Sequence, residues 1–209
     1  MTTREKILNA VNSLKSFKRG SETHRTIVQE FNKARKKKYT TDTAYCAMTL
    51  WYILKLAGLD NKWVTESCTQ SYNNAKKNKN FKILDIRKAQ SGDVVFYDWD
   101  RSGDCDHVGI LLQRNGSYCT VYEGNAGALN GGGGAVVRQI NTKIKCAVSF
   151  LPTGDVNGDG TVNAKDALQT LRHAVGKTEL NAEAQHHADV NGDGKINAKD
   201  ALEILNMKG

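Results

Sequence analysis

The sequence lacks any apolar run long enough to cross a membrane. Its longest run, AYCAMTLWYILKLAGL at residues 44–59, is interrupted by Lys55 and falls short of the roughly 18–20 residues that a span needs. We expect a buried helix there and no membrane association. The N-terminal segment MTTREKILNAVNSLKSF also lacks the basic-then-apolar layout of a secretory signal. We therefore expect either a cytosolic chain or a mature or trimmed chain from which a signal has been removed.

The sequence also lacks a nucleic-acid-binding motif, although its net charge is +8. Residues 1–153 hold 24 lysines and arginines against 13 acidic residues, a net of +11, and residues 154–209 hold 6 against 9, a net of −3. The basic runs KARKKK (33–38) and KKNK (76–79) are expected to be solvated faces. A basic body and an acidic tail favour an anionic target for the body and cations for the tail, and nucleic acid is not an expected partner.

Cysteine is present at five positions: Cys46, Cys68, Cys105, Cys119 and Cys146. A domain of about 150 residues builds its own hydrophobic core, so we expect no disulfide framework. Cys119 and Cys146 fall on predicted strands, and both are expected to be free and packed.

Two nearly identical acidic loops end the sequence, GDVNGDGTVNAKD at 154–166 and ADVNGDGKINAKD at 188–200. Each has the 1-3-5-7-9-12 spacing of oxygen ligands in a twelve-residue calcium loop, with glycine at position 6. Position 7 gives only its carbonyl oxygen, and position 12 is aspartate. We expect two calcium ions, without which a module of about 55 residues has too little core to fold. The ligand positions are Asp155, Asn157, Asp159, Thr161, Asn163 and Asp166, and then Asp189, Asn191, Asp193, Lys195, Asn197 and Asp200.

A helical segment follows each loop, and no strong helix precedes either one. This tandem resembles a dockerin, the module that attaches secreted enzymes to cohesin domains of a scaffold; a free calcium-sensor pair is the rival reading. The resemblance implies a cohesin partner and a secreted, scaffold- or cell-surface-associated chain. Both repeats read NAKDAL, so a partner could bind in two orientations related by a half turn. The positions that match cohesin-facing ones are Ala164, Lys165, Leu171 and Arg172, and Ala198, Lys199, Leu205 and Asn206.

The stretch TTDTAYCAMTLWYILKLAG (40–58) places a cysteine near the start of a helix. The cluster Thr41–Thr43 is expected to cap the helix and Gly58 to end it. Cys46 would then lie in the first turn, where unpaired N–H groups and the helix dipole favour the thiolate. A buried structural cysteine is the alternative.

A second stretch, SGDVVFYDWDRSGDCDHVGILLQRNGSYCTVYEGN (91–125), predicts strands at 93–97, 107–112 and 117–123. His107 begins the second of these strands, and Glu123 and Asn125 close the third. Antiparallel pairing through the RNGS turn brings both ends to one edge of the sheet. An acid or amide there can orient the imidazole and stabilise its charge.

The order of cysteine, histidine and then Glu/Asn is that of papain-like cysteine hydrolases. The elements GDVVFYDWD, DHVGILL and TVYEGN, with AYCAMTLWYILKLAG upstream, resemble the CHAP amidohydrolase/peptidase family over roughly residues 5–150. The resemblance implies Cys46 as nucleophile, His107 as general base and acid, and Glu123 as the group that orients His107. It implies Asn125 as a further polar helper near the imidazole or oxyanion, and whether Glu123 or Asn125 dominates stays open.

The expected architecture is α+β: a papain-like CHAP domain at 1–152, with N-terminal helices packed on an antiparallel sheet, and an all-α dockerin at 154–209 with two loop-helix repeats. The loop DWDRSGDCD (98–106) mimics calcium-loop spacing, so a third, weak calcium site is an expectation, with an exposed acidic hairpin tip as the alternative. The run GALNGGGG (127–134) is expected to be a mobile loop.

The expected function is a monomeric, scaffold-attached cysteine amidase or endopeptidase that cleaves amide bonds of bacterial peptidoglycan. The net charge of +11 over residues 1–153 suits an anionic wall. The alternatives are a protease that acts on proteins of the scaffold complex and a non-catalytic wall-binding module.

Overall fold

A computed structural model of the chain describes residues 3–78, 80–127, 130–140, 143–150, 154–157 and 161–207, the side chain of Glu183 excepted. The chain divides into two compact units, residues 2–149 and 150–209. The first unit combines helices with a six-stranded antiparallel sheet and the second is helical, so the expected α+β class is confirmed.

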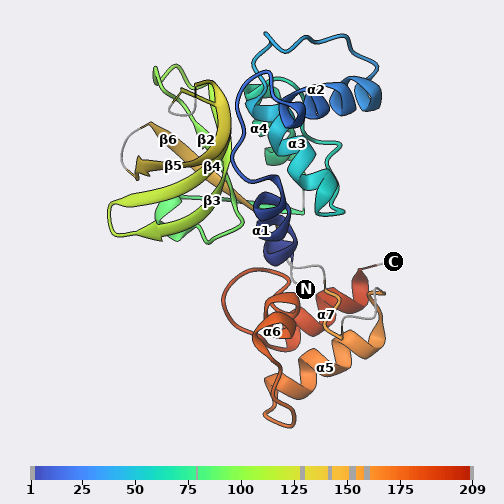
Figure 1. Cartoon of the computed structure of the whole chain (residues 1–209). Helices are drawn as coiled ribbons and strands as arrows, with labels where there is room; N and C mark the ends of the chain where they lie inside the picture. Colours follow the sequence, from blue (N-terminus) through green and yellow to red (C-terminus); the bar gives the residue numbers. More distant parts are fainter. Residues whose placement is uncertain are drawn as a thin grey trace. The chain divides into compact units, whose positions relative to one another are not determined.

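Four helices begin the first unit, and in Figure 1 they gather on one side of the sheet. They are α1 (Thr3–Leu14), α2 (Glu22–Arg35), α3 (Cys46–Leu56) and α4 (Cys68–Lys77). The sequence CAMTLWYILKL of α3 is apolar all round, and eight of its eleven residues are buried. A helix of this kind belongs in the centre of a core. Gly58, with φ +68, follows its C-terminus, as the sequence predicts.

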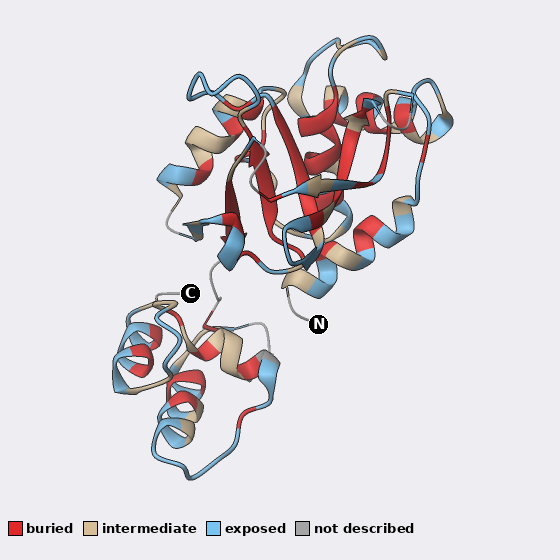
Figure 2. Cartoon of the chain, turned by 90° about the vertical axis from the view of Figure 1, so that its left-hand side faces the viewer, coloured by how far each residue is buried: buried red, intermediate tan, exposed pale blue. Residues whose placement is uncertain are grey.

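The sheet has the strand order β1-β6-β2-β3-β4-β5. The strands are β1 (Phe81–Leu84), β2 (Val94–Tyr97), β3 (His107–Asn115), β4 (Tyr118–Ala126), β5 (Gly132–Gln139) and β6 (Ile144–Phe150), with a short 3-10 helix, η1 (Ile86–Lys88), between β1 and β2. The strand β2 is buried along its whole length, and Figure 2 shows long buried runs through the centre of the sheet. The three strands predicted around residues 93–123 are confirmed as β2, β3 and β4.

The register places a set of functional side chains on one face of the sheet. Tyr97 lies opposite His107, and Gly109 lies opposite Glu123. Because side chains two residues apart along a strand share a face, His107 and Glu123 point to the same side. Arg138 lies opposite Cys119, four residues before Glu123, and therefore joins the same face.

The other face of β4 fits closely against α3 at Gly124. A Cβ atom at this glycine would lie 2.0 Å from Oγ1 of Thr49, which is buried and donates to the carbonyl of Tyr45. Thr49 cannot move away easily, because this hydrogen bond fixes its hydroxyl group.

We therefore expect Gly124→Ala to lower the free energy of unfolding by about 2 kcal/mol, the usual cost of forcing extra volume into a filled core. Thermal unfolding followed by circular dichroism measures the effect. Gly127→Ala is the matched control, because a Cβ at Gly127 meets nothing within 4 Å. Equal melting temperatures for the two variants would contradict this account.

The prediction of a mobile loop at 127–134 is wrong for its last three residues, and residues 128–129 lie outside the described part. Gly132–Gly134 begin β5, and the backbones of Phe17 and Gly133 exchange two hydrogen bonds of 2.9 Å. A Cβ at Gly132 would lie 1.9 Å from the carbonyl oxygen of Phe17. The glycines therefore serve close backbone pairing.

The second unit contains three helices among its described residues: α5 (Ala164–Ala174), α6 (Ala182–Ala188) and α7 (Ala198–Asn206). Its small core includes Val156, Leu180, Val190 and Ile204. No strong helix is expected before either loop, and before the second loop the structure has a short one: α6, of seven residues, ends at the residue before Asp189. Asn181 caps this helix by accepting a hydrogen bond from the Ala184 backbone, and Ala184 and Ala188 pack into the core.

Candidate active site and calcium loops

Cys46 is the first residue of α3, so its predicted place in the first turn is confirmed. The predicted cap is wrong. Tyr45 precedes the helix without a side-chain cap, and Thr43 instead closes a turn by donating its backbone N–H to the carbonyl of Thr40. The N–H groups at the start of α3 therefore have no side-chain cap, and that of Ala47 hydrogen-bonds to the sulfur of Cys46.

The sulfur of Cys46 lies in a buried polar environment. Its Sγ is 3.4 Å from Sγ of Cys68, the first residue of α4. Hydrogen bonding from Cys68 and then from His107 outweighs the effect of burial and holds the pKa of Cys46 well below its usual range. A backbone hydrogen bond from Ala47 acts in the same direction. This thiol is favoured as the thiolate, the form in which cysteine is nucleophilic.

Glu123 is buried completely and holds His107 in place. Its Oε2 lies 3.2 Å from Nε2 of His107 and accepts from Nη2 of Arg138 at 2.8 Å, while Oε1 accepts from the hydroxyl of Tyr97 at 2.6 Å. Since Nε2 of His107 faces Glu123, the other ring nitrogen, Nδ1, is the one left for Cys46.

These contacts determine the charges at the site. Burial alone would lower the pKa of His107, but hydrogen bonds with Cys46 and Glu123 outweigh it and raise the pKa to about 9. Burial would raise the pKa of Glu123, but hydrogen bonds from His107 and Arg138 outweigh it and lower the pKa to about 2. Near neutral pH the arrangement therefore favours a thiolate, an imidazolium and a carboxylate in series.

Asn125 makes contacts different from those of Glu123, and they place it near the start of α3. Its Oδ1 accepts from Nη2 of Arg19 at 3.2 Å, and its backbone hydrogen-bonds to the side chain of Tyr45. Within the described part of the chain, the carboxylate in contact with His107 belongs to Glu123. Glu123 and Asn125 therefore lie at different places: Glu123 contacts the imidazole, and Asn125 lies beside Tyr45, the residue that precedes Cys46.

Three neighbours of the site were not predicted. Cys68 directly follows Ser67, the N-cap of α4. This serine is the sequence signal that could have predicted Cys68 at a helix start. Trp99, 41% exposed, stacks on the ring of His107 with a centroid distance of 5.1 Å. Arg138 lies on β5, a strand that was not predicted because its glycine-rich start is typical of a loop. Trp99 covers the imidazole while leaving a surface that a substrate can contact.

The loop at 98–106 brings its carboxylates together. One oxygen each of Asp98, Asp100 and Asp106 lies within 4.8 Å of the others. Nζ of Lys145 lies 3.3 Å from Asp98, however, and Oδ2 of Asp106 accepts from the backbone of Trp99. A cation of the chain itself therefore already neutralises part of this cluster.

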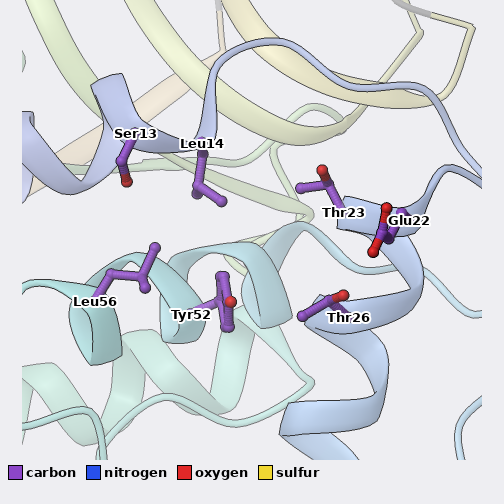
Figure 3. Close-up of a pocket in the computed structure, with 7 residues that line it drawn as sticks. All are labelled: Ser13, Leu14, Glu22, Thr23, Thr26, Tyr52 and Leu56. Carbon is purple, nitrogen blue, oxygen red and sulfur yellow. The ribbon is translucent and has the colours of Figure 1, made fainter.

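A polar cavity described in the first unit lies elsewhere. Its volume is about 360 Å³, and Figure 3 shows its side chains around an opening between α1, α2 and α3. Tyr52 and Leu56 contribute from the second half of α3, so the cavity is displaced along that helix from Cys46. None of its lining residues is a predicted site residue. They are Ser13, Leu14, Glu22, Thr23, Thr26, Tyr52 and Leu56.

The second acidic loop has the internal contacts that a calcium loop needs. Asp189 accepts from the backbones of Asp193 and Gly194 at 3.0 and 2.9 Å, and Gly194 has φ +83, which is the sharp turn expected at position 6. Asp200 is buried, and its Oδ1 accepts no hydrogen bond from any described residue. A buried carboxylate oxygen without a partner, among carboxylate and amide oxygens, fits a hard divalent cation such as calcium.

The first loop differs at its last position. Oδ1 of Asp166 accepts from the backbones of Val156 and Asn157 at 2.8 and 3.0 Å, and Oδ2 accepts from Asn163 at 2.9 Å. With two lone pairs on each carboxylate oxygen, these bonds leave one lone pair on Oδ2 for a metal and none on Oδ1. Asp159 lies outside the described residues. The other described ligand positions of the two loops precede α5 and α7, as the repeated sequence predicts. Both helices begin with a capping box.

An apolar groove of about 360 Å³ lies between α5 and α7. Each residue that lines it from α5 has its counterpart 34 positions later on α7. Eight residues line it: Ala164, Ala167, Leu168, Leu171, Ala198, Ala201, Leu202 and Leu205. All eight predicted partner-binding residues are exposed, and four of them lie in this groove.

A helix-start cysteine beside a strand-borne histidine, in an α+β unit, is the arrangement of papain-like cysteine hydrolases. Residues 36–125 match the model of the CHAP domain, and residues 153–207 match that of the dockerin type I domain. The chain therefore contains a CHAP domain followed by a dockerin type I domain, in the predicted order. No curated protein and no solved structure matches the chain.

The two domains carry general implications. A CHAP domain suggests a peptidoglycan hydrolase or amidase, and a dockerin suggests cohesin binding and calcium binding. Together the two domains suggest an extracellular, wall-associated protein. No helix of the described residues is long and apolar enough to span a membrane.

Proposed function

We propose that this chain is a cysteine amidase or endopeptidase that cleaves amide bonds of peptidoglycan and is attached to a scaffold through its dockerin. The observation that carries the proposal is the sulfur of Cys46 at the start of α3, hydrogen-bonded with His107, which Glu123 in turn holds at 3.2 Å. Nucleophile, base and orienting group stand in sequence, as covalent catalysis by a thiol requires.

In the proposed first step, the Cys46 thiolate attacks the carbonyl carbon of the amide. The negative charge that develops on the carbonyl oxygen is stabilised by backbone N–H groups at the start of α3, including that of Cys46 itself. His107, protonated below a pKa of about 9, then gives its proton to the leaving amine, and a thioester forms at Cys46.

In the second step, His107 takes a proton from a water molecule that attacks the carbonyl carbon of the thioester. The C–S bond breaks, the carboxylic acid leaves, and Cys46 returns to the thiolate beside the imidazolium. Glu123 keeps the imidazole oriented through both steps and stabilises its charged form. Arg138 donates to both oxygens of the carboxylate, at 3.3 Å to Oε1 and 2.8 Å to Oε2, and Tyr97 donates to Oε1 at 2.6 Å. Asn125 is a polar helper beside Tyr45, near the side where the oxyanion forms.

The substrate class is tested on purified sacculi. We expect the chain to lower their turbidity and to release fragments whose masses identify the amide bond that was cut. The net charge of +11 over residues 1–153 supports an anionic wall as substrate. Cleavage of casein or of dockerin-bearing enzymes, with sacculi left intact, would favour a protease instead.

The dockerin is proposed to bind one cohesin through the groove between α5 and α7. The two halves of this groove repeat with an offset of 34 residues and expose Leu171 and Leu205 by 41% and 55%. Such internal symmetry supports binding in two orientations. The carboxylate and amide oxygens of the two loops would bind calcium, and the bound ions would hold α5 and α7 in place.

The pH dependence of activity tests the role of Glu123. The imidazolium is present below the pKa of His107, so we expect the rate at low substrate concentration to fall as pH rises through about 9. Glu123→Gln removes the carboxylate that raises this pKa, and the alkaline limb should move down by roughly one pH unit. Arg138→Gln keeps the carboxylate and should cause no downward shift. An alkaline limb that stays in place in Glu123→Gln would contradict the assignment.

A further inference from the structure

Two of the five cysteines lie at hydrogen-bonding distance from one another. Sγ of Cys46 and Sγ of Cys68 are 3.4 Å apart, and both residues are free thiols, buried to the same extent with 6% of their surface exposed. Each is the first residue of its helix. In the proposed mechanism only the sulfur of Cys46 reacts, and the sulfur of Cys68 contributes through its hydrogen bond to Cys46.

We propose that Cys46 and Cys68 form an oxidative modification site, at which a small peroxide converts the two thiols into a reversible disulfide. The sulfur atoms must approach from 3.4 Å to about 2.05 Å, a movement of about 1.4 Å shared between two side chains. The consequence for activity rests on the proposed function, because the disulfide would consume its nucleophile.

The first step is attack by the Cys46 thiolate on one oxygen of hydrogen peroxide. An S–O bond forms, the O–O bond breaks, and the departing hydroxide takes the proton of the His107 imidazolium and becomes water. Cys46 is oxidised to a sulfenic acid, and the peroxide is reduced.

In the second step the sulfur of Cys68 attacks the sulfenic sulfur of Cys46. The S–S bond forms, the S–O bond breaks, and the proton from Cys68 combines with the leaving hydroxyl to give a second water. Two thiols and one peroxide thus become one disulfide and two waters. A dithiol such as dithiothreitol reverses the modification by exchange.

The electrostatics of the pair support this division of roles. The neighbouring Cys46 sulfur and burial raise the pKa of Cys68, so Cys68 stays protonated while Cys46 is the anion. Conversion of Cys46 to a neutral sulfenic acid removes the charge that contributes to this rise and frees Cys68 to react. Two other cysteines are less acidic than Cys46: burial, with the charge of Cys146, raises the pKa of Cys105 to about 12, and burial raises that of Cys146 to about 11.

The test treats the reduced full-length chain with hydrogen peroxide, blocks remaining thiols with iodoacetamide, and maps the peptides by mass spectrometry without reduction. We expect one cross-linked peptide pair joining Cys46 to Cys68, lighter by two hydrogen atoms than the sum of its parts. We also expect wall-lytic activity to be lost, with both changes reversed by dithiothreitol.

Cys68→Ala and Cys68→Ser lack the second thiol, and either one serves if the other does not fold. Before peroxide we expect lower activity in these variants, because the hydrogen bond from Cys68 to Cys46 is absent while that from His107 remains. After peroxide we expect sulfinic or sulfonic acid at Cys46 and a loss of the remaining activity that dithiothreitol does not reverse. Cys146→Ala is the matched control and should behave as wild type. Peroxide-treated wild type with over-oxidised Cys46 and no cross-link would overturn the proposal.

The mass measurement also separates this inference from the proposed function. A cross-link in a chain that leaves sacculi intact would support the thiol pair and count against the hydrolase. Lytic activity without a cross-link would support the hydrolase and overturn the modification site.

Discussion

Replacing Cys46 by alanine is expected to lower the rate of wall solubilisation by at least about 10⁴-fold, because a residue of a catalytic unit takes most of the covalent pathway with it when it is removed. The side chain is small and lies at a helix start, so the fold should survive. Circular dichroism and the melting temperature check this, and the rate of turbidity loss of sacculi measures the effect. Cys146→Ala removes another buried thiol and should keep full activity.

Alkylation gives a second, substrate-free measurement of the same thiol. Near neutral pH we expect iodoacetamide to label one of the five cysteines quickly, namely Cys46, since its pKa is lowered while those of Cys68, Cys105, Cys119 and Cys146 are raised. An inert Cys46 would favour the non-catalytic wall-binding module. Full lytic activity in Cys46→Ala would overturn the mechanism.

Removal of calcium is expected to unfold the dockerin and to abolish cohesin binding. The core of this unit is small, with buried residues such as Val156, Leu180 and Ile204, and metal binding to its loops therefore supplies folding free energy. Addition of a chelator should lower the helical signal in circular dichroism and release the chain from an immobilised cohesin. Binding that persists in chelator would contradict this prediction.

Calorimetric titration with calcium counts the sites. We expect two ions per chain in wild type and one in Asp189→Ala, which removes the first ligand of the second loop. Lys195→Ala is the matched control, because position 7 contributes only its carbonyl oxygen. A third ion, lost in Asp98→Asn, would show that the 98–106 loop also binds calcium in spite of Lys145.

The sequence by itself determined much of this molecule, because its strongest signals are local. The apolar run ending at Gly58 predicts α3, with Cys46 in its first turn, and the alternation around His107 predicts β3 and β4. The calcium loops can be predicted because all ligands of each loop lie within one short segment, and the segment occurs twice. For such features, neighbours in the chain are also neighbours in space.

Only the tertiary structure decided which side chains surround the reactive sulfur and the carboxylate that contacts His107. Cys68 is 22 residues from Cys46 and Arg138 is 15 from Glu123, and each comes from a different element, so no spacing along the chain connects them. The choice between Glu123 and Asn125 at His107 depends on strand register, because the two residues are close in sequence but their contacts lie apart. Register and helix docking are properties of the whole core, and the environment of the reactive sulfur could be described only after the core was assembled.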